Sequence, residues 1–133
     1  GKAMKTQQTH PITIDDVIDA QNALSGVVTR TPLLESADAN AHLGGRLLIK
    51  AENMQRTGAF KIRGAYNCIR QLTAEQKTSG VITYSSSNHA QGVALAAQLL
   101  GTNALIVMPD DVSQAKIDAT RALGASIVTF ARD

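Results

Sequence analysis

Hydrophobic and polar residues alternate in a regular order along the second half of the chain. Three short apolar runs, Val81–Tyr84, Ala104–Met108 and Ser126–Phe130, predict strands. Between them, Asn88–Leu100 and Ser113–Leu123 have apolar residues at helical spacing, and a glycine follows each. This strand–helix–strand order predicts right-handed βαβ units and a parallel sheet. We therefore expect an α/β fold with helices packed on the sheet in a three-layer α/β/α arrangement.

The first half of the chain is less regular. Apolar residues at helical spacing follow Thr13, and Asp16 stands in the reciprocal position of a capping box, so a helix should begin there. Pro32 disfavours helix at the residue before it and predicts a short extended stretch. Arg46–Lys50 is a candidate strand, and Phe60–Leu72 has the spacing of a helix.

Composition excludes several classes of protein. The 133 residues are 44% hydrophobic, and a net charge of +2 gives no basic surface of the kind that nucleic-acid binding needs. No apolar run reaches the roughly 18 residues of a membrane span. Cys68 is the single cysteine, so no internal disulfide can form, and we expect a cytoplasmic protein. The three histidines are far apart, so no metal site is expected.

A run of small polar residues lies where the first of the three strands should feed the next helix. Ser85, Ser86, Ser87, Asn88 and His89 offer hydroxyls, an amide and free backbone N–H groups at a helix start. Such a loop can hold a carboxylate or a phosphate. The alternative is that these residues only cap the helix.

A second loop, Thr57–Lys61, also enters a helix through a glycine. Lys61 would stand in the first helical turn, where the helix dipole disfavours a positive charge and so favours the neutral amine. The neutral amine is the form that attacks carbonyl groups. The alternative is a solvated surface lysine, and Arg63 reads as a structural residue.

Both loops resemble motifs of a known group of enzymes. Glu52–Ala65 resembles the lysine motif of pyridoxal-phosphate enzymes with the tryptophan-synthase β-like fold (fold type II), and Ser85–Gly92 resembles their asparagine loop. The threonine dehydratase and serine racemase group is the most similar branch, which Arg30–Leu34 and Ala104–Pro109 also match. The resemblance runs from about Ile14 to the end of the chain.

The resemblance implies pyridoxal 5′-phosphate as cofactor and gives each loop a role. Lys61 would hold the cofactor aldehyde as a Schiff base and would then be the general base for the substrate Cα proton. Phe60 would pack beside the cofactor, and Asn88 would hydrogen-bond its ring oxygen. Ser86 falls where the racemase branch places its acid/base for the opposite face. Four residues would bind the substrate, with its carboxylate held by the serines and the histidine: Ser85, Ser86, Asn88 and His89.

Two positions depart from the group's usual motifs. Ala59 replaces a serine, as it does in serine racemase-like members. Ser87 replaces a glycine. If that position requires a positive φ, serine costs about 1 kcal/mol or more and distorts the anion site.

The resemblance also implies an organisation and an activity. Residues 1–73 would belong to the large pyridoxal-phosphate lobe and residues 74–133 to a small βαβ lobe. The group's phosphate-binding loop lies further downstream, so we expect a truncated protein that is incomplete for catalysis. The implied activity is a threonine or serine ammonia-lyase (dehydratase) that is a homo-oligomer when complete, with serine racemase or 3-hydroxyaspartate dehydratase as alternatives. A non-catalytic anion-binding or interaction module is the alternative from another class.

Overall fold

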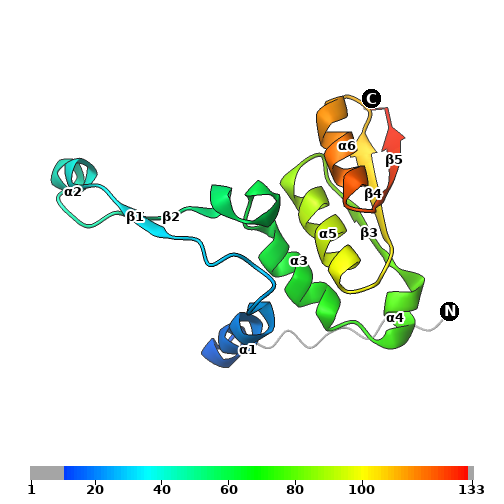
Figure 1. The fold of residues 1–133 in the computed structure, drawn as a ribbon, viewed down its shortest axis with the longest axis horizontal. Helices are drawn as coiled ribbons and strands as arrows, with labels where there is room; N and C mark the ends of the chain where they lie inside the picture. The colour runs from blue at the N-terminus through cyan, green and yellow to red at the C-terminus, as the bar shows by residue number, and fades with distance from the viewer. Residues whose placement is uncertain (1–10, 132–133) are drawn as a thin grey trace.

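The computed structural model describes residues 11–131 as a small α/β body with a projecting arm (Figure 1). In chain order the elements are α1 (Ile14–Leu24), β1 (Leu33–Glu35), α2 (Ala37–Leu43), β2 (Leu48–Lys50), two 3₁₀ turns (Glu52–Met54 and Arg56–Gly58), α3 (Lys61–Arg70), α4 (Ala74–Ser79), β3 (Val81–Tyr84), α5 (Asn88–Leu99), β4 (Ala104–Pro109), α6 (Gln114–Ala122) and β5 (Ser126–Phe130). None of the helices in these residues is long and apolar enough to cross a membrane.

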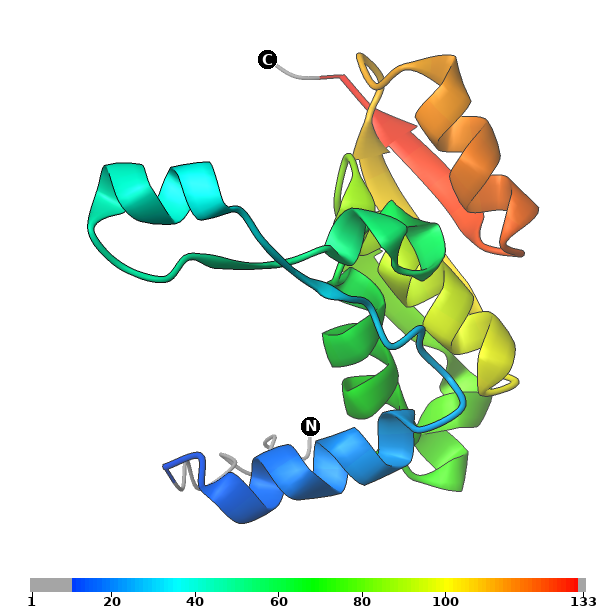
Figure 2. The same cartoon turned by 60° about the vertical axis from the view of Figure 1, so that its left-hand side comes forward.

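The body is built on a three-stranded parallel sheet in the order β3–β4–β5, which confirms the predicted α/β class. The register aligns Thr83 with Ile106 and Ile106 with Ile127. Both crossovers step in the same direction, so right-handed connections place α5 and α6 on the same face of the sheet. Figure 2 shows both helices beside the strands that they connect.

The core lies between this face and the two helices. Ile106 and Met108 of β4 are fully buried there, together with the alanines of α5. Because alanine is small, α3 packs closely against the outer side of α5, and Ile62 of α3 is also fully buried. This contact brings the start of α3 next to the first turns of α5.

The opposite face of the sheet is open among the described residues. Ile82 and Tyr84 of β3 and Val128 of β5 are exposed there, and the Tyr84 ring lies 5.7 Å from that of Phe130. Alternation along each strand puts these side chains opposite the buried ones. Among the described residues, helices therefore cover one face of the sheet and leave the other exposed.

The arm is an antiparallel pair of strands with a short helix at its tip (Figure 1). Leu34 of β1 pairs with Ile49 of β2, and α2 lies between the two strands. The sequence analysis did not predict α2. Its signals are an N-cap serine, Ser36, whose hydroxyl accepts from the N–H of Ala39, and Gly44, which ends the helix at φ 66°.

Candidate active site

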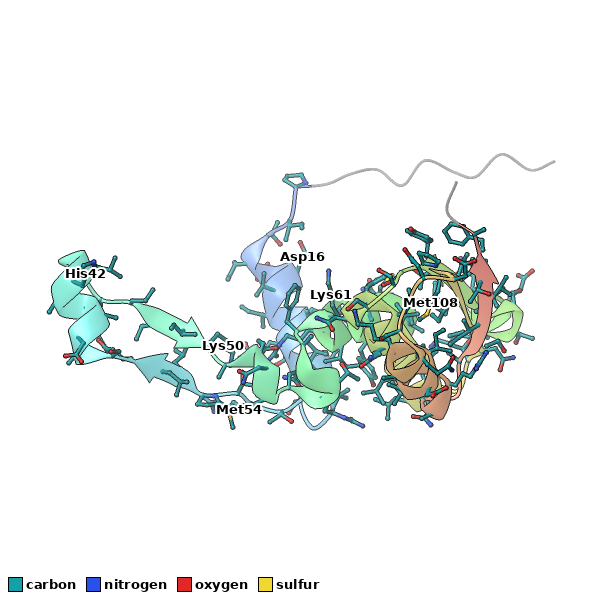
Figure 3. The ribbon with its side chains drawn as sticks, turned by 90° about the horizontal axis from the view of Figure 1, so that it is seen from above. Asp16, His42, Lys50, Met54, Lys61 and Met108 are labelled. Carbon is teal, nitrogen blue, oxygen red and sulfur yellow. The ribbon has the colours of Figure 1, made fainter. Side chains whose placement is uncertain are left out.

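The two predicted loops meet where α3 packs on α5. Lys61 begins α3 and Asn88 begins α5. Gly92 lies one turn beyond Asn88 on the same face of α5, and a Cβ placed on it would be 2.9 Å from the Lys61 Cβ. The structure therefore puts Lys61 on the Asn88 side of α5. Figure 3 shows Lys61 between the arm that carries Lys50 and the sheet that carries Met108.

The Lys61 amine is not engaged by other polar groups. Its Nζ lies 5.0 Å from the centroid of the Phe60 ring, which is 58% exposed. Lys61 makes no hydrogen bond or ion pair with any described residue, and the first turn of α3 contains no acidic side chain. The amine is therefore available to a ligand.

The turns before Lys61 are tied to the extended segment that follows α1. The buried Gln55 carboxamide accepts from the Thr29 N–H at 2.9 Å and donates to the Thr29 carbonyl at 2.8 Å. The Arg56 guanidinium donates to the Val27 carbonyl at 2.7 Å. These bonds fix the path of the chain into Lys61.

A carboxylate and a guanidinium reinforce the same connection. Glu52 accepts two hydrogen bonds from Arg63, at 2.7 and 2.8 Å, and one from the Thr31 hydroxyl at 2.5 Å. The Arg63 hydrogen bonds, helped by the one from Thr31, outweigh burial and lower the pKa of Glu52 to about 2. Arg63 thus has the structural role that the sequence analysis expected.

Thr57 is a strained residue that sequence reasoning missed. Its φ of 64° is the only positive value among the described non-glycine residues. Its Oγ1 is buried without a hydrogen-bond partner. Both features cost free energy, and such costs concentrate at functional sites. The surrounding structure therefore holds the turn before Lys61 in a locally strained conformation.

The serine loop divides into capping groups and available groups. The Ser85 Oγ accepts from the N–H groups of Ser87 and Ala90, both at 3.2 Å, and so acts as a cap. The His89 ring turns back to the strand, with Nε2 3.1 Å from the Thr83 Oγ1. The structure therefore supports the capping interpretation for Ser85.

The other groups of this loop are available. The side chains of Ser86 and Asn88 and the backbone N–H groups of Asn88 and His89 have no hydrogen-bond partner among the described residues. They lie at the start of α5, where the dipole favours a negative charge. This arrangement can bind a carboxylate.

Ser87 does not have the positive φ on which the expected cost of a serine depended. Its φ is −156°, an extended value open to any residue, and its ψ is −134°. The condition on which that cost depended, a positive φ, is not met here. Serine is therefore compatible with the backbone of this loop.

We expect Ser87→Gly to lower stability by about 0.5–1 kcal/mol, because glycine adds entropy to the unfolded chain without relieving strain. The urea unfolding midpoint measures this change. A higher midpoint for Ser87→Gly would mean that the position does require positive φ. Gly101→Ser is the reciprocal control, since Gly101 has φ 67° and open space around it. That variant should be destabilised by about 1 kcal/mol.

Comparison with known proteins decides the family. The profile of the pyridoxal-phosphate dependent enzymes matches residues 24–133. The chain belongs to this family. It is 49% identical over 117 residues to an L-threo-3-hydroxyaspartate ammonia-lyase of a Pseudomonas species and 50% identical over 117 residues to an L-threonine ammonia-lyase of Thermotoga maritima. These alignments cover 88% of the chain, but 37% and 29% of the relatives' lengths.

Solved structures of the same family have the same fold. The maize serine racemase structure superposes with a TM-score of 0.86 at 40% identity, over 93% of this chain and 38% of that one. The tomato (Solanum lycopersicum) threonine deaminase isoform 2 structure gives 0.80 at 42% identity, over 90% and 35%. The predicted fold type is therefore confirmed, and a serine racemase and a threonine deaminase are among the proteins that the chain resembles.

The residues of the site fit one end of the family's cofactor. Pyridoxal phosphate carries an aldehyde and a ring oxygen on an aromatic ring. The site offers the Lys61 amine and the Asn88 carboxamide, neither hydrogen-bonded to a described residue, and the exposed aromatic ring of Phe60. The amine suits the aldehyde, the carboxamide suits the ring oxygen, and the Phe60 ring suits the aromatic ring of the cofactor.

Proposed function

We propose that this chain carries the lysine and asparagine loops of a pyridoxal-phosphate-dependent ammonia-lyase for β-hydroxy amino acids. The products would be a 2-oxo acid and ammonia. One observation carries the proposal: Lys61, at the start of α3, has no hydrogen-bond or ion-pair partner among the described residues and lies on the same side of α5 as Asn88. A non-catalytic module would not need an amine at this point.

Lys61 would hold the aldehyde and afterwards move the proton. Bound pyridoxal phosphate supplies an electron sink for charge that develops on the substrate Cα. The Lys61 Nζ would take the Cα proton. Phe60 would pack on one side of the ring, and the Asn88 carboxamide would donate to the ring oxygen.

The start of α5 would bind the substrate carboxylate. The Ser86 hydroxyl and the N–H groups of Asn88 and His89 supply the donors. Ser85 would complete this site through its remaining hydroxyl proton, because its oxygen already accepts two N–H groups. The His89 side chain would support the loop through Thr83.

Racemisation is a second candidate activity, which two observations favour. The maize serine racemase structure resembles this chain over 93% of its length. In addition, the Ser86 hydroxyl has no partner among the described residues, so it can exchange a proton. In that case Ser86 would serve the face of the substrate opposite Lys61.

The substrate range follows from the names of the relatives. Two of them act on L-threo-3-hydroxyaspartate and on L-threonine, as their names state. All the candidates share an α-amino acid with a β-hydroxyl group. We propose threonine, serine or 3-hydroxyaspartate as the substrate of this chain's site.

We further propose a two-lobe, homo-oligomeric cytoplasmic enzyme, with residues 1–73 in one lobe and 74–133 in the other. Exposed leucines on the arm, Leu33, Leu34 and Leu48, support self-association. The single cysteine agrees with a reducing compartment. Sedimentation at two protein concentrations tests the oligomer, and a strictly monomeric result would contradict it.

Cofactor trapping tests the main proposal. The chain is incubated with pyridoxal phosphate, reduced with borohydride and digested, and the modified lysine is located by mass spectrometry. Portions of the same incubation that are neither reduced nor digested receive L-threonine, L-serine or L-threo-3-hydroxyaspartate, and 2-oxo acid and D-amino acid are measured. A reduced adduct at Lys61 supports the enzyme. A folded chain that forms no adduct supports the non-catalytic module instead.

A further inference from the structure

We propose that Gly92 is a positioning residue, which sets the place of Lys61 relative to Asn88. This inference rests on the proposed function, in which Lys61 is the reactive amine. It assigns a role to a residue that has no side chain. That role comes from the close approach of the α5 backbone at Gly92 to the α3 backbone at Lys61.

The contact at Gly92 is tighter than at any other described glycine. A Cβ on Gly92 would lie 2.9 Å from both the carbonyl carbon and the Cβ of Lys61, and 3.1 Å from the Ile62 nitrogen. Non-bonded carbon atoms have their optimal separation at about 3.5–4.0 Å. Two of these three atoms are backbone atoms and the third is the first carbon of the side chain. No rotamer change can therefore make room.

Backbone conformation does not explain a glycine at this position. Gly92 lies inside α5 and, unlike six other described glycines, has no positive φ. Helix propensity opposes glycine there by about 1 kcal/mol relative to alanine. Close approach is the remaining physical reason for it.

The contact ties the two loops together. Gly92 is one turn from Asn88, so the two residues share a face of α5. Ile62, next to Lys61, is fully buried and anchors the first turn of α3 in the core. A larger residue at position 92 must therefore move the start of α3 away from α5, and Lys61 moves with it relative to Asn88.

Gly92→Ala should therefore reduce the selectivity of Lys61 for pyridoxal phosphate. In the trapping experiment, the ratio of adduct at Lys61 to adduct at Lys116 is measured within one sample. We expect this ratio to fall by about tenfold, because misplacement by even 1 Å can cost a site about a hundredfold. The fraction of folded protein is measured in the same samples, because unfolding would lower the adduct at Lys61 but not at the exposed Lys116.

Two variants serve as matched controls. Gly64→Ala adds the same methyl group to α3, where the new Cβ would meet no heavy atom within 4 Å apart from its chain neighbours and the helix's own backbone. Ala97→Gly destabilises α5 at a buried position away from Lys61. Both should leave the adduct ratio within about twofold of the parent chain, if misplacement rather than lost stability is the cause.

A second measurement does not depend on the cofactor. In the parent chain, NMR should show an NOE between the Gly92 Hα and the Lys61 Hβ protons. In Gly92→Ala, the amide shifts of Lys61 and Asn88 should change, and those of β5 should not. If the parent chain forms no adduct, the proposed function fails, and these shifts alone decide the positioning role.

Three results would overturn the role of Gly92. The first is a folded Gly92→Ala chain with an unchanged adduct ratio. The second is unchanged shifts at Lys61 and Asn88. The third is a Gly92→Ala chain that does not fold, because the close approach would then be a requirement of folding rather than a means of placing the lysine.

Discussion

In the full-length enzyme, Lys61→Ala is expected to abolish the covalent adduct with pyridoxal phosphate and, with it, any formation of 2-oxo acid. The Lys61 amine is the primary amine placed on the Asn88 side of α5, and it makes no hydrogen bond or ion pair with any described residue. Removing a group that both holds the cofactor and moves a proton should lower turnover by about a thousandfold or more. Absorbance of the bound cofactor and borohydride trapping measure the first effect, and release of 2-oxo acid from L-threonine measures the second.

Two further lysine variants make this result specific. Lys61→Arg keeps the positive charge but cannot form the same bond to an aldehyde, so it should also lose the adduct. Lys116→Ala removes an exposed lysine of α6 and should leave the adduct unchanged. An adduct of the same yield in Lys61→Ala would refute the assignment of Lys61.

Sequence periodicity predicted the parallel sheet well for a physical reason. The runs Val81–Tyr84 and Ser126–Phe130 match β3 and β5 in full, and Ala104–Met108 is one residue short of β4. Strands with a buried face must be apolar, and glycines end the intervening helices, so local chemistry marks each boundary. The arm was harder to predict, because α2 has no buried residue and hence no apolar face to detect.

The sequence motifs predict which residues form the candidate site, but not which of them cap a helix and which remain available to a ligand. The sequence identifies Lys61 and the serine loop, yet it does not show that the Ser85 hydroxyl already caps two N–H groups. Nor does it show the φ of Ser87, since the same letters are compatible with extended and left-handed backbone. Non-local packing determines both, as it does the approach of Gly92 to Lys61.

The connection between Glu52 and Arg63 gives a prediction of a different kind, which concerns stability and its dependence on pH. Glu52→Gln should lower the free energy of unfolding at pH 7 by about 2 kcal/mol. The glutamine amide would present a donor to Arg63, which is itself only a donor, so one hydrogen bond at this partly buried site would be lost. Urea unfolding measures the change.

The pH dependence follows from the lowered pKa of Glu52. In the folded chain this pKa is about 2, below its ordinary value of 4.5, so the ionised carboxylate stabilises the fold fully above pH 4.5. That contribution is lost as the pH falls from 4.5 towards 2. The stability difference between the parent chain and Glu52→Gln should therefore be constant near neutral pH and shrink over this window.

Glu35→Gln is the matched control for this experiment. Glu35 also pairs with an arginine, Arg46, but on the arm, where the Arg46 side chain is 73% exposed. Solvent screens such a pair, so its removal should change stability little at any pH. If Glu52→Gln behaved like Glu35→Gln, the Glu52–Arg63 pair would not hold the turns before Lys61, and their path would depend on Gln55 and Arg56 instead.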